Sequence, residues 1–76
     1  MSNLILFSTE GCHLCEQAQR LIYSVLGQTV PEVDIADRPD LLDHYAVRIP
    51  VLHRMDSGEE LDWPFAAADV LALAEN

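Results

Sequence analysis

The stretch LILFSTEGCHLCEQAQRLIYSVLG, residues 4–27, contains both cysteines of the chain, Cys12 and Cys15. Its first residues, 4–7, form a continuous apolar run, which is typical of a strand buried on both faces. From the cysteines onward, apolar residues recur at helical spacing until Gly27, where a helix can end. The apolar positions are Leu14, Ala18, Leu21, Ile22, Val25 and Leu26, and the polar residues between them are Glu16, Gln17, Gln19 and Arg20. This stretch therefore predicts a strand, a turn and a helix that begins at the cysteine pair.

The rest of the chain predicts three more strands and two more helices. The strands are expected at residues 30–35, 50–54 and 59–63, and the helices at residues 38–45 and from Pro64 onward. Pro31 cannot donate to a strand ladder, so its strand should lie at one edge of the sheet, and the short acidic last strand at the other. The first two strands must be parallel because a helix connects them, whereas the last two form an antiparallel hairpin. We predict a single α/β domain over residues 1–76, βαβαββα, with a four-stranded mixed sheet flanked by three helices.

Composition and charge exclude several classes of protein. The 76 residues include 13 Asp and Glu but only four Arg and no Lys, which gives a net charge of −9. This charge opposes binding to nucleic acid and to anionic membranes. The apolar run at residues 4–7 is too short for a membrane span or a signal-peptide core. We expect a soluble, monomeric protein of the reducing cytoplasm, where two close cysteines are more often catalytic or metal-binding than structural.

The cysteine pair has three interpretations. As a structural staple it would close only a tiny loop, which removes little entropy from the unfolded chain. A zinc site commonly takes four ligands, and His13, His44 and His53 lack the spacing of a second ligand pair. We expect His44 to be solvated and His53 to be packed or hydrogen-bonded in a central strand. Redox chemistry is the interpretation that the spacing favours, and no metal site is predicted.

Thiol–disulfide exchange needs one thiolate that attacks and a second thiol that resolves the mixed disulfide. If Cys12 lies in the first turn of the helix, the unpaired backbone amides stabilise its thiolate and Cys15 is one turn away. Thiols in such settings have pKa values of about 3.5–7.5 rather than ~8.5. We therefore assign attack to Cys12 and resolution to Cys15. His13 would favour the thiolate if charged, but it is equally compatible with an exposed turn residue that has no role.

Two segments resemble a known family. FSTEGCHLC, residues 7–15, resembles the active-site segment of glutaredoxins, and RIPV, residues 48–51, resembles their Thr-Val-Pro stretch. Together with LDWPF, residues 61–65, they resemble the small bacterial glutaredoxin-like proteins. The resemblance implies a thioredoxin-like (glutaredoxin) fold and supports the roles given to the two cysteines. It also implies that Pro50 follows a cis peptide bond and faces the disulfide, and that the Ile49 backbone hydrogen-bonds an extended thiol substrate.

The chain departs from glutaredoxins where they hold glutathione. Thr9 stands where glutaredoxins commonly have a lysine, the Gly-Gly-x-Asp stretch before the last helix is poorly matched, and neither residue between the cysteines is proline. Arg48 is the only obvious substitute for the missing cation, and the acidic chain is an unfavourable host for an anionic peptide. The candidate substrate-binding residues are thus Ile49, Pro50, His13 and Arg48. We expect Trp63 to pack in the core beside Phe65.

These inferences predict a small thiol–disulfide oxidoreductase. Its substrates would be protein disulfides or glutathione mixed disulfides, and a reductase system would recycle it. We expect no bound cofactor, with glutathione as a candidate reductant. Two alternatives remain open at this point: a metal or iron–sulfur binding module, and a thioredoxin-fold binding protein without catalysis.

Overall fold

The computed structural model describes residues 3–75 and follows the predicted order of strands and helices. The strands are β1 (Leu4–Ser8), β2 (Glu32–Asp34), β3 (Val51–Arg54) and β4 (Glu60–Asp62). The helices are α1 (His13–Leu26), α2 (Pro39–Tyr45) and α3 (Ala67–Glu75), with a short 3₁₀ turn, η1 (Ile35–Asp37), before α2. Within the described residues, no helix is long and apolar enough to cross a membrane.

The four strands form one mixed sheet in the order β2-β1-β3-β4. β1 runs parallel to β2, with Phe7 opposite Val33, and antiparallel to β3, with Phe7 opposite Val51. β4 runs antiparallel to β3, with Asp62 opposite Val51. The predicted edge positions of β2 and β4 are confirmed, and β1 and β3 occupy the centre of the sheet.

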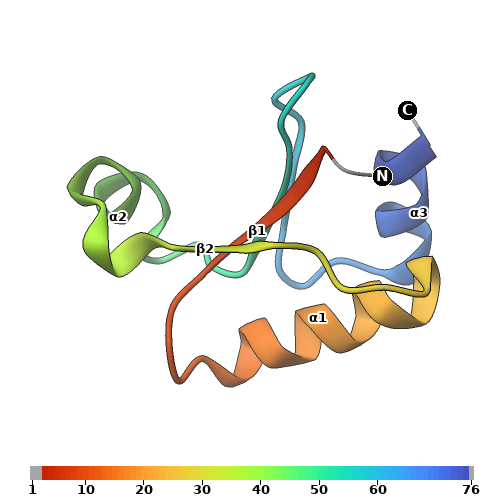
Figure 1. The fold of residues 1–76 in the computed structure, drawn as a ribbon, viewed down its shortest axis with the longest axis horizontal. Helices are drawn as coiled ribbons and strands as arrows, with labels where there is room; N and C mark the ends of the chain where they lie inside the picture. The colour runs from red at the N-terminus through yellow and green to blue at the C-terminus, as the bar shows by residue number, and fades with distance from the viewer. Residues whose placement is uncertain (1–2, 76) are drawn as a thin grey trace.

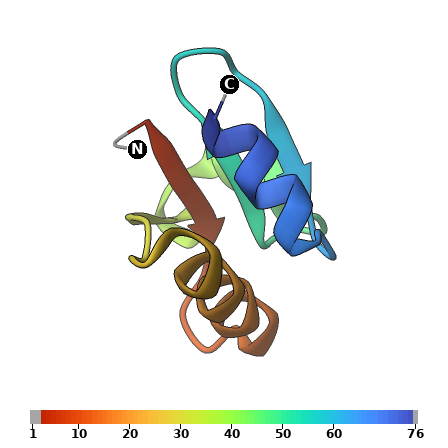
Figure 2. The same ribbon diagram turned by 90° about the vertical axis from the view of Figure 1, so that its right-hand side faces the viewer.

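The helices cover the two faces of the sheet unequally. The larger core joins one face of β1 and β3 to α1 and α3; its buried residues are Leu4, Leu6, Ala18, Ile22, Val30, Leu52, Phe65, Val70 and Leu73. The smaller core joins the opposite face to α2 and η1; its buried residues are Phe7, Ile35, Tyr45 and Val51. α2 and α3 lie at opposite ends of the long axis in Figure 1, and Figure 2 shows α1 nearly end-on. This is the predicted thioredoxin-like arrangement.

Several predicted boundaries are wrong by one to three residues, including the start of β2 at Glu32 in place of residue 30, and local hydrogen bonds explain two of them. β2 ends at Asp34, before the expected residue 35, because the Asp34 carboxylate accepts a bond from the Ala36 N–H (2.9 Å) and starts η1. α3 begins at Ala67 and not at Pro64, and its start is capped by Asp69, which accepts from the Ala66 N–H (2.9 Å). β4 is shorter than residues 59–63 at both ends.

The segment between β4 and α3 packs as expected although it is not helical. The Trp63–Pro64 bond is cis, and no local signal predicts this. The rings of Trp63 and Phe65 meet edge to face, with centroids 5.1 Å apart. Phe65 is buried in the larger core and Trp63 packs partly buried against that core, so the expected packing of Trp63 beside Phe65 is confirmed, at the margin of the core.

Candidate redox site

Cys12 occupies the N-cap position of α1. Its backbone is extended (φ −92°, ψ 107°), and its Sγ accepts a hydrogen bond from the Cys15 N–H at 3.1 Å. The helix itself starts at His13, so the expectation that Cys12 lies within the first turn is wrong by one residue. The N-cap position favours a thiolate on Cys12, because an N-cap side chain accepts directly from the unpaired amides of the helix start.

Cys12 and Cys15 are joined by a disulfide, with their Cα atoms 5.2 Å apart. Cys15 is only 3% exposed, whereas Cys12 is partly exposed at the end of the loop that follows β1. An external thiol or disulfide therefore reaches the sulfur of Cys12 more readily than that of Cys15. This asymmetry agrees with the assignment of attack to Cys12.

The Ile49–Pro50 bond is cis, as the resemblance implied. Because β3 is antiparallel to β1 and Val51 lies opposite Phe7, the segment before β3 and the cysteine loop after β1 leave the sheet at the same end. Pro50 is fully buried there, and its carbonyl oxygen accepts from the Trp63 N–H at 3.2 Å. The topology thus brings the predicted proline segment to the end of the sheet that carries the cysteines.

The Ile49 backbone is only partly free to bind a substrate. Its N–H donates to the carbonyl oxygen of Tyr45 at 3.1 Å, and the Arg48 N–H donates to the same oxygen at 2.8 Å. Substrate binding by the Ile49 backbone stays a prediction. Because the Ile49 N–H is already bonded, only its carbonyl group could bind a substrate.

Arg48 lies next to this segment, but its charge is already matched. Its guanidinium pairs with Glu60 and Asp62, each at an N–O distance of 2.8 Å, and stands over the ring of Tyr45, 5.0 Å from the centroid. The hydrogen bonds to Asp62 and Glu60 raise the pKa of the guanidinium above its ordinary value. The role of Arg48 in holding a glutathione carboxylate stays a prediction, and such a carboxylate would have to compete with two internal ones.

Glu60 is the centre of a polar network that the sequence analysis missed. It accepts hydrogen bonds from the Tyr45 hydroxyl and from Arg48, and its Oε2 lies 2.9 Å from Nδ1 of His53. Burial and the bond to Glu60 raise the pKa of Tyr45 to about 12. Burial alone would raise the pKa of Glu60, but the bonds from Tyr45, Arg48 and His53 outweigh it and lower that pKa. His53 lies opposite Glu60 in the β3–β4 register, so hairpin pairing is the signal that could have found this contact.

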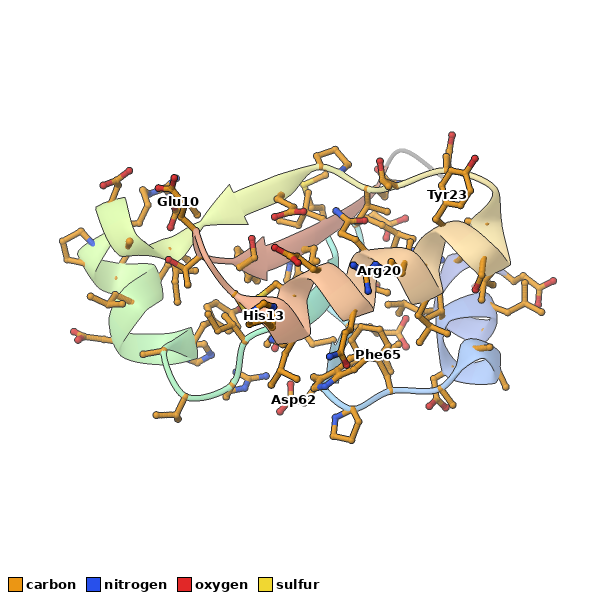
Figure 3. The ribbon with its side chains drawn as sticks, turned by 90° about the horizontal axis from the view of Figure 1, so that it is seen from below. Glu10, His13, Arg20, Tyr23, Asp62 and Phe65 are labelled. Carbon is orange, nitrogen blue, oxygen red and sulfur yellow. A yellow bond between two sulfur atoms is a disulfide. The ribbon has the colours of Figure 1, made fainter. Side chains whose placement is uncertain are left out.

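The three histidines have different surroundings. The side chain of His13 is 93% exposed, and its Nδ1 lies 4.0 Å from Oε1 of Glu16. Figure 3 shows His13 at the start of α1, after the loop that carries Glu10. His44 is exposed against the edge of the Tyr45 ring. His53 is hydrogen-bonded within the sheet, as predicted. Among residues 3–75, no three His, Cys, Asp or Glu side chains gather as metal ligands.

A hollow of about 170 Å³ lies between β4 and α3, away from the cysteines. Its lining residues are Glu59, Glu60, Leu61, Asp69, Ala72 and Leu73. Three of these six are carboxylates, so the hollow does not offer a site for an anionic peptide such as glutathione.

Solved structures of similar chains share the fold of this one over most of its length. An X-ray structure of the protein XcR50 from X. campestris is 36% identical, with 95% of each chain covered and a TM-score of 0.83. A solution structure of XcR50 gives the same identity and TM-score, over 96% of this chain and 92% of that one. The solution structure of Ne2328 from Nitrosomonas europaea is 28% identical, covers 95% and 88%, and has a TM-score of 0.70.

No curated protein matches the chain. The family model of the glutaredoxin-like domain (DUF836) matches residues 3–74, which include both cysteines, the cis-proline segment and all four strands. The chain therefore belongs to the glutaredoxin-like domain family.

Proposed function

We propose that this chain is a dithiol oxidoreductase that reduces disulfides of other molecules with Cys12 and Cys15. The observation that supports this most directly is the hydrogen bond from the Cys15 N–H to the Cys12 Sγ at the start of α1. On reduction, the same amide and the positive end of the helix dipole would stabilise a thiolate on Cys12. The partly exposed sulfur is then also the nucleophilic one.

The reaction proceeds through a mixed disulfide. The Cys12 thiolate attacks one sulfur of the substrate disulfide, a Cys12–substrate bond forms, the substrate S–S bond breaks, and the leaving sulfur takes up a proton. The Cys15 thiolate then attacks the Cys12 sulfur, forms the intramolecular disulfide and expels the second substrate sulfur, which is also protonated. Two electrons have passed to the substrate, and an external thiol reductant returns the protein to the dithiol.

We infer that this reductant is a reductase or a neutral dithiol in preference to glutathione. Glu10 and Glu16 flank the cysteine pair in the sequence. The guanidinium of Arg48 forms ion pairs with Glu60 and Asp62. An anionic tripeptide would meet negative charge on approach, and Arg48, the arginine next to the proline segment, is already paired. Turnover with thioredoxin reductase and NADPH, exceeding turnover with glutathione and its reductase, is the expected result; equal or reversed rates would refute this inference.

The assignment of the cysteines is tested with three proteins: wild type, Cys12→Ser and Cys15→Ser. Wild type should reduce a peptide disulfide with dithiothreitol as reductant, and Cys12→Ser should lose this activity. Cys15→Ser should form a mixed disulfide with the peptide that is stable enough to detect by intact-mass spectrometry. Full activity of Cys12→Ser, or a peptide adduct on Cys15 in the Cys12→Ser protein, would contradict the proposed roles.

A further inference from the structure

The segment between α2 and β3 is buried at Pro50 but exposed at Val47. Val47 is 98% exposed, whereas Pro50, three residues later, is fully buried. Backbone bonds restrain this segment at its two ends, from Arg48 and Ile49 to Tyr45 O and from Trp63 to Pro50 O. Proline has no N–H, so Pro50 adds no donor of its own. Side-chain contacts must supply the remaining restraint.

Arg48 supplies this restraint by reaching from the segment to β4. Its Nη2 donates to Glu60 Oε1 and to Asp62 Oδ1, both at 2.8 Å, and its Nε donates to Asp62 Oδ2 at 3.3 Å. Glu60 and Asp62 are two residues apart on one strand and therefore point to the same face of the sheet. The two bonds to Asp62 use the planar fork of a guanidinium, a geometry that a lysine ammonium cannot reproduce.

The residues around Arg48 are themselves held in place by the sheet. Asp62 lies opposite Val51, the first residue of β3, so the ion pair closes directly over the point where the segment enters the sheet. The Tyr45 ring lies under the guanidinium and stacks on Phe7 of β1, with ring centroids 4.3 Å apart. The Tyr45 hydroxyl also donates to Glu60. The segment is thus braced against β1 and β4 at once.

We propose that Arg48 is a positioning residue that holds the Ile49–Pro50 segment in the conformation that receives a peptide disulfide substrate. This inference rests on the proposed function and gives Arg48 a task other than binding glutathione. A pre-organised segment costs less conformational entropy when a substrate binds. The bracing therefore acts on the binding of extended peptide substrates and leaves the Cys12 thiolate, at the start of a different element, unchanged.

The test compares Arg48→Lys with wild type on two substrates, well below the unfolding temperature of each protein. Arg48→Lys keeps the charge but loses the fork, and Arg20→Lys, on the exposed side of α1, is the matched control. For a peptide disulfide, we expect KM of Arg48→Lys to rise about tenfold with kcat within about twofold of wild type. The single-turnover rate with 2,2′-dithiodipyridine, a neutral disulfide that has no peptide backbone to dock, should not change. Asp62→Asn, which weakens the same contact from β4, should raise KM in the same direction.

Two results would overturn the role of Arg48 while leaving the proposed function intact. One is a KM for Arg48→Lys equal to that of Arg20→Lys. The other is a parallel fall in the rates with both substrates, which would indicate a general structural defect. A wild-type protein that reduces neither substrate would instead refute the proposed function, and the positioning role with it.

Discussion

Gln19 connects the helix that carries the cysteines to the edge of the sheet, and its replacement is a sharp test of the fold. Its Nε2 donates to the carbonyl oxygen of Val30 at 2.7 Å, and its Oε1 accepts from the Val30 N–H at 3.2 Å. The Nε2 also donates to Glu32 at 3.0 Å. Val30 lies just outside β2, and among the described residues neither its N–H nor its carbonyl group bonds to a neighbouring strand. The side-chain amide of Gln19 satisfies both groups.

The Gln19→Met variant removes these bonds but keeps the length and the helix propensity of the side chain. Val30 is 6% exposed, so both its N–H and its carbonyl would be left nearly buried without a partner. Each such group costs about 1–3 kcal/mol, and because Gln19 is itself partly exposed, water can replace part of the loss. We therefore expect the free energy of unfolding to fall by about 2 kcal/mol, out of the roughly 4–11 kcal/mol typical of a chain of this length.

Urea unfolding of the oxidised protein measures this loss. With a slope of about 1 kcal/mol per molar urea for a small domain, the midpoint should fall by about 2 M. Gln17→Met is the matched control, because Gln17 is exposed on the same helix and should tolerate the change. If the two variants unfold at the same urea concentration, the reasoning from Gln19 to Val30 is wrong.

Three further predictions concern the core and the polar network. Leu6→Ala, at a fully buried position, should destabilise the protein by about 3 kcal/mol in urea, whereas Leu71→Ala, 45% exposed, should cost well under 1 kcal/mol; similar losses would contradict the packing described above. The pKa of Tyr45 is raised from 10.0 to about 12, so the contribution of Tyr45 to stability is present below pH 10 and is lost as the pH rises towards 12. A phenolate titration followed by absorbance should show a late component that Tyr45→Phe removes. If this component persists in Tyr45→Phe, Tyr45 is not its source. Because the pKa of Glu60 is lowered, its contribution is present above the ordinary value of 4.5 and lost as the pH falls through the folded pKa; the urea midpoint of wild type should therefore fall more between pH 7 and pH 3 than that of Glu60→Gln, and an equal fall would refute this.

Local signals in the sequence were sufficient to predict the arrangement of the backbone. The apolar run of β1, the helical spacing after Cys12 and the proline at residue 31 determine where strands and helices lie, and few connections between them are compatible with a single sheet. Two of the boundaries that were wrong, the end of β2 and the start of α3, depend on short-range capping by Asp34 and Asp69. Such caps shift the end of a strand or helix through small differences in free energy, and the spacing of apolar residues does not reveal these differences.

The side-chain contacts across the sheet were beyond sequence reasoning. Gln19 was placed among the polar residues of the first helix, and nothing local indicates that its amide reaches Val30, 11 residues later. The pairing of Arg48 with Glu60 and Asp62 depends on the register of a hairpin whose strand ends were not predicted correctly.

This difference explains which properties the family resemblance transfers to the chain. The N-cap cysteine and the cis bond before Pro50 are features of the backbone, and the fold that the family shares is enough to establish them. Ligand preference depends instead on which charged side chains remain unpaired near the sulfur, and a shared fold does not determine that. In this chain Arg48 is paired with two carboxylates, so the free energy of these ion pairs helps to hold the proline segment before any ligand binds. Under the function proposed above, a glutathione carboxylate that bound Arg48 would have to break those ion pairs, whereas a peptide disulfide would gain from the order that they impose.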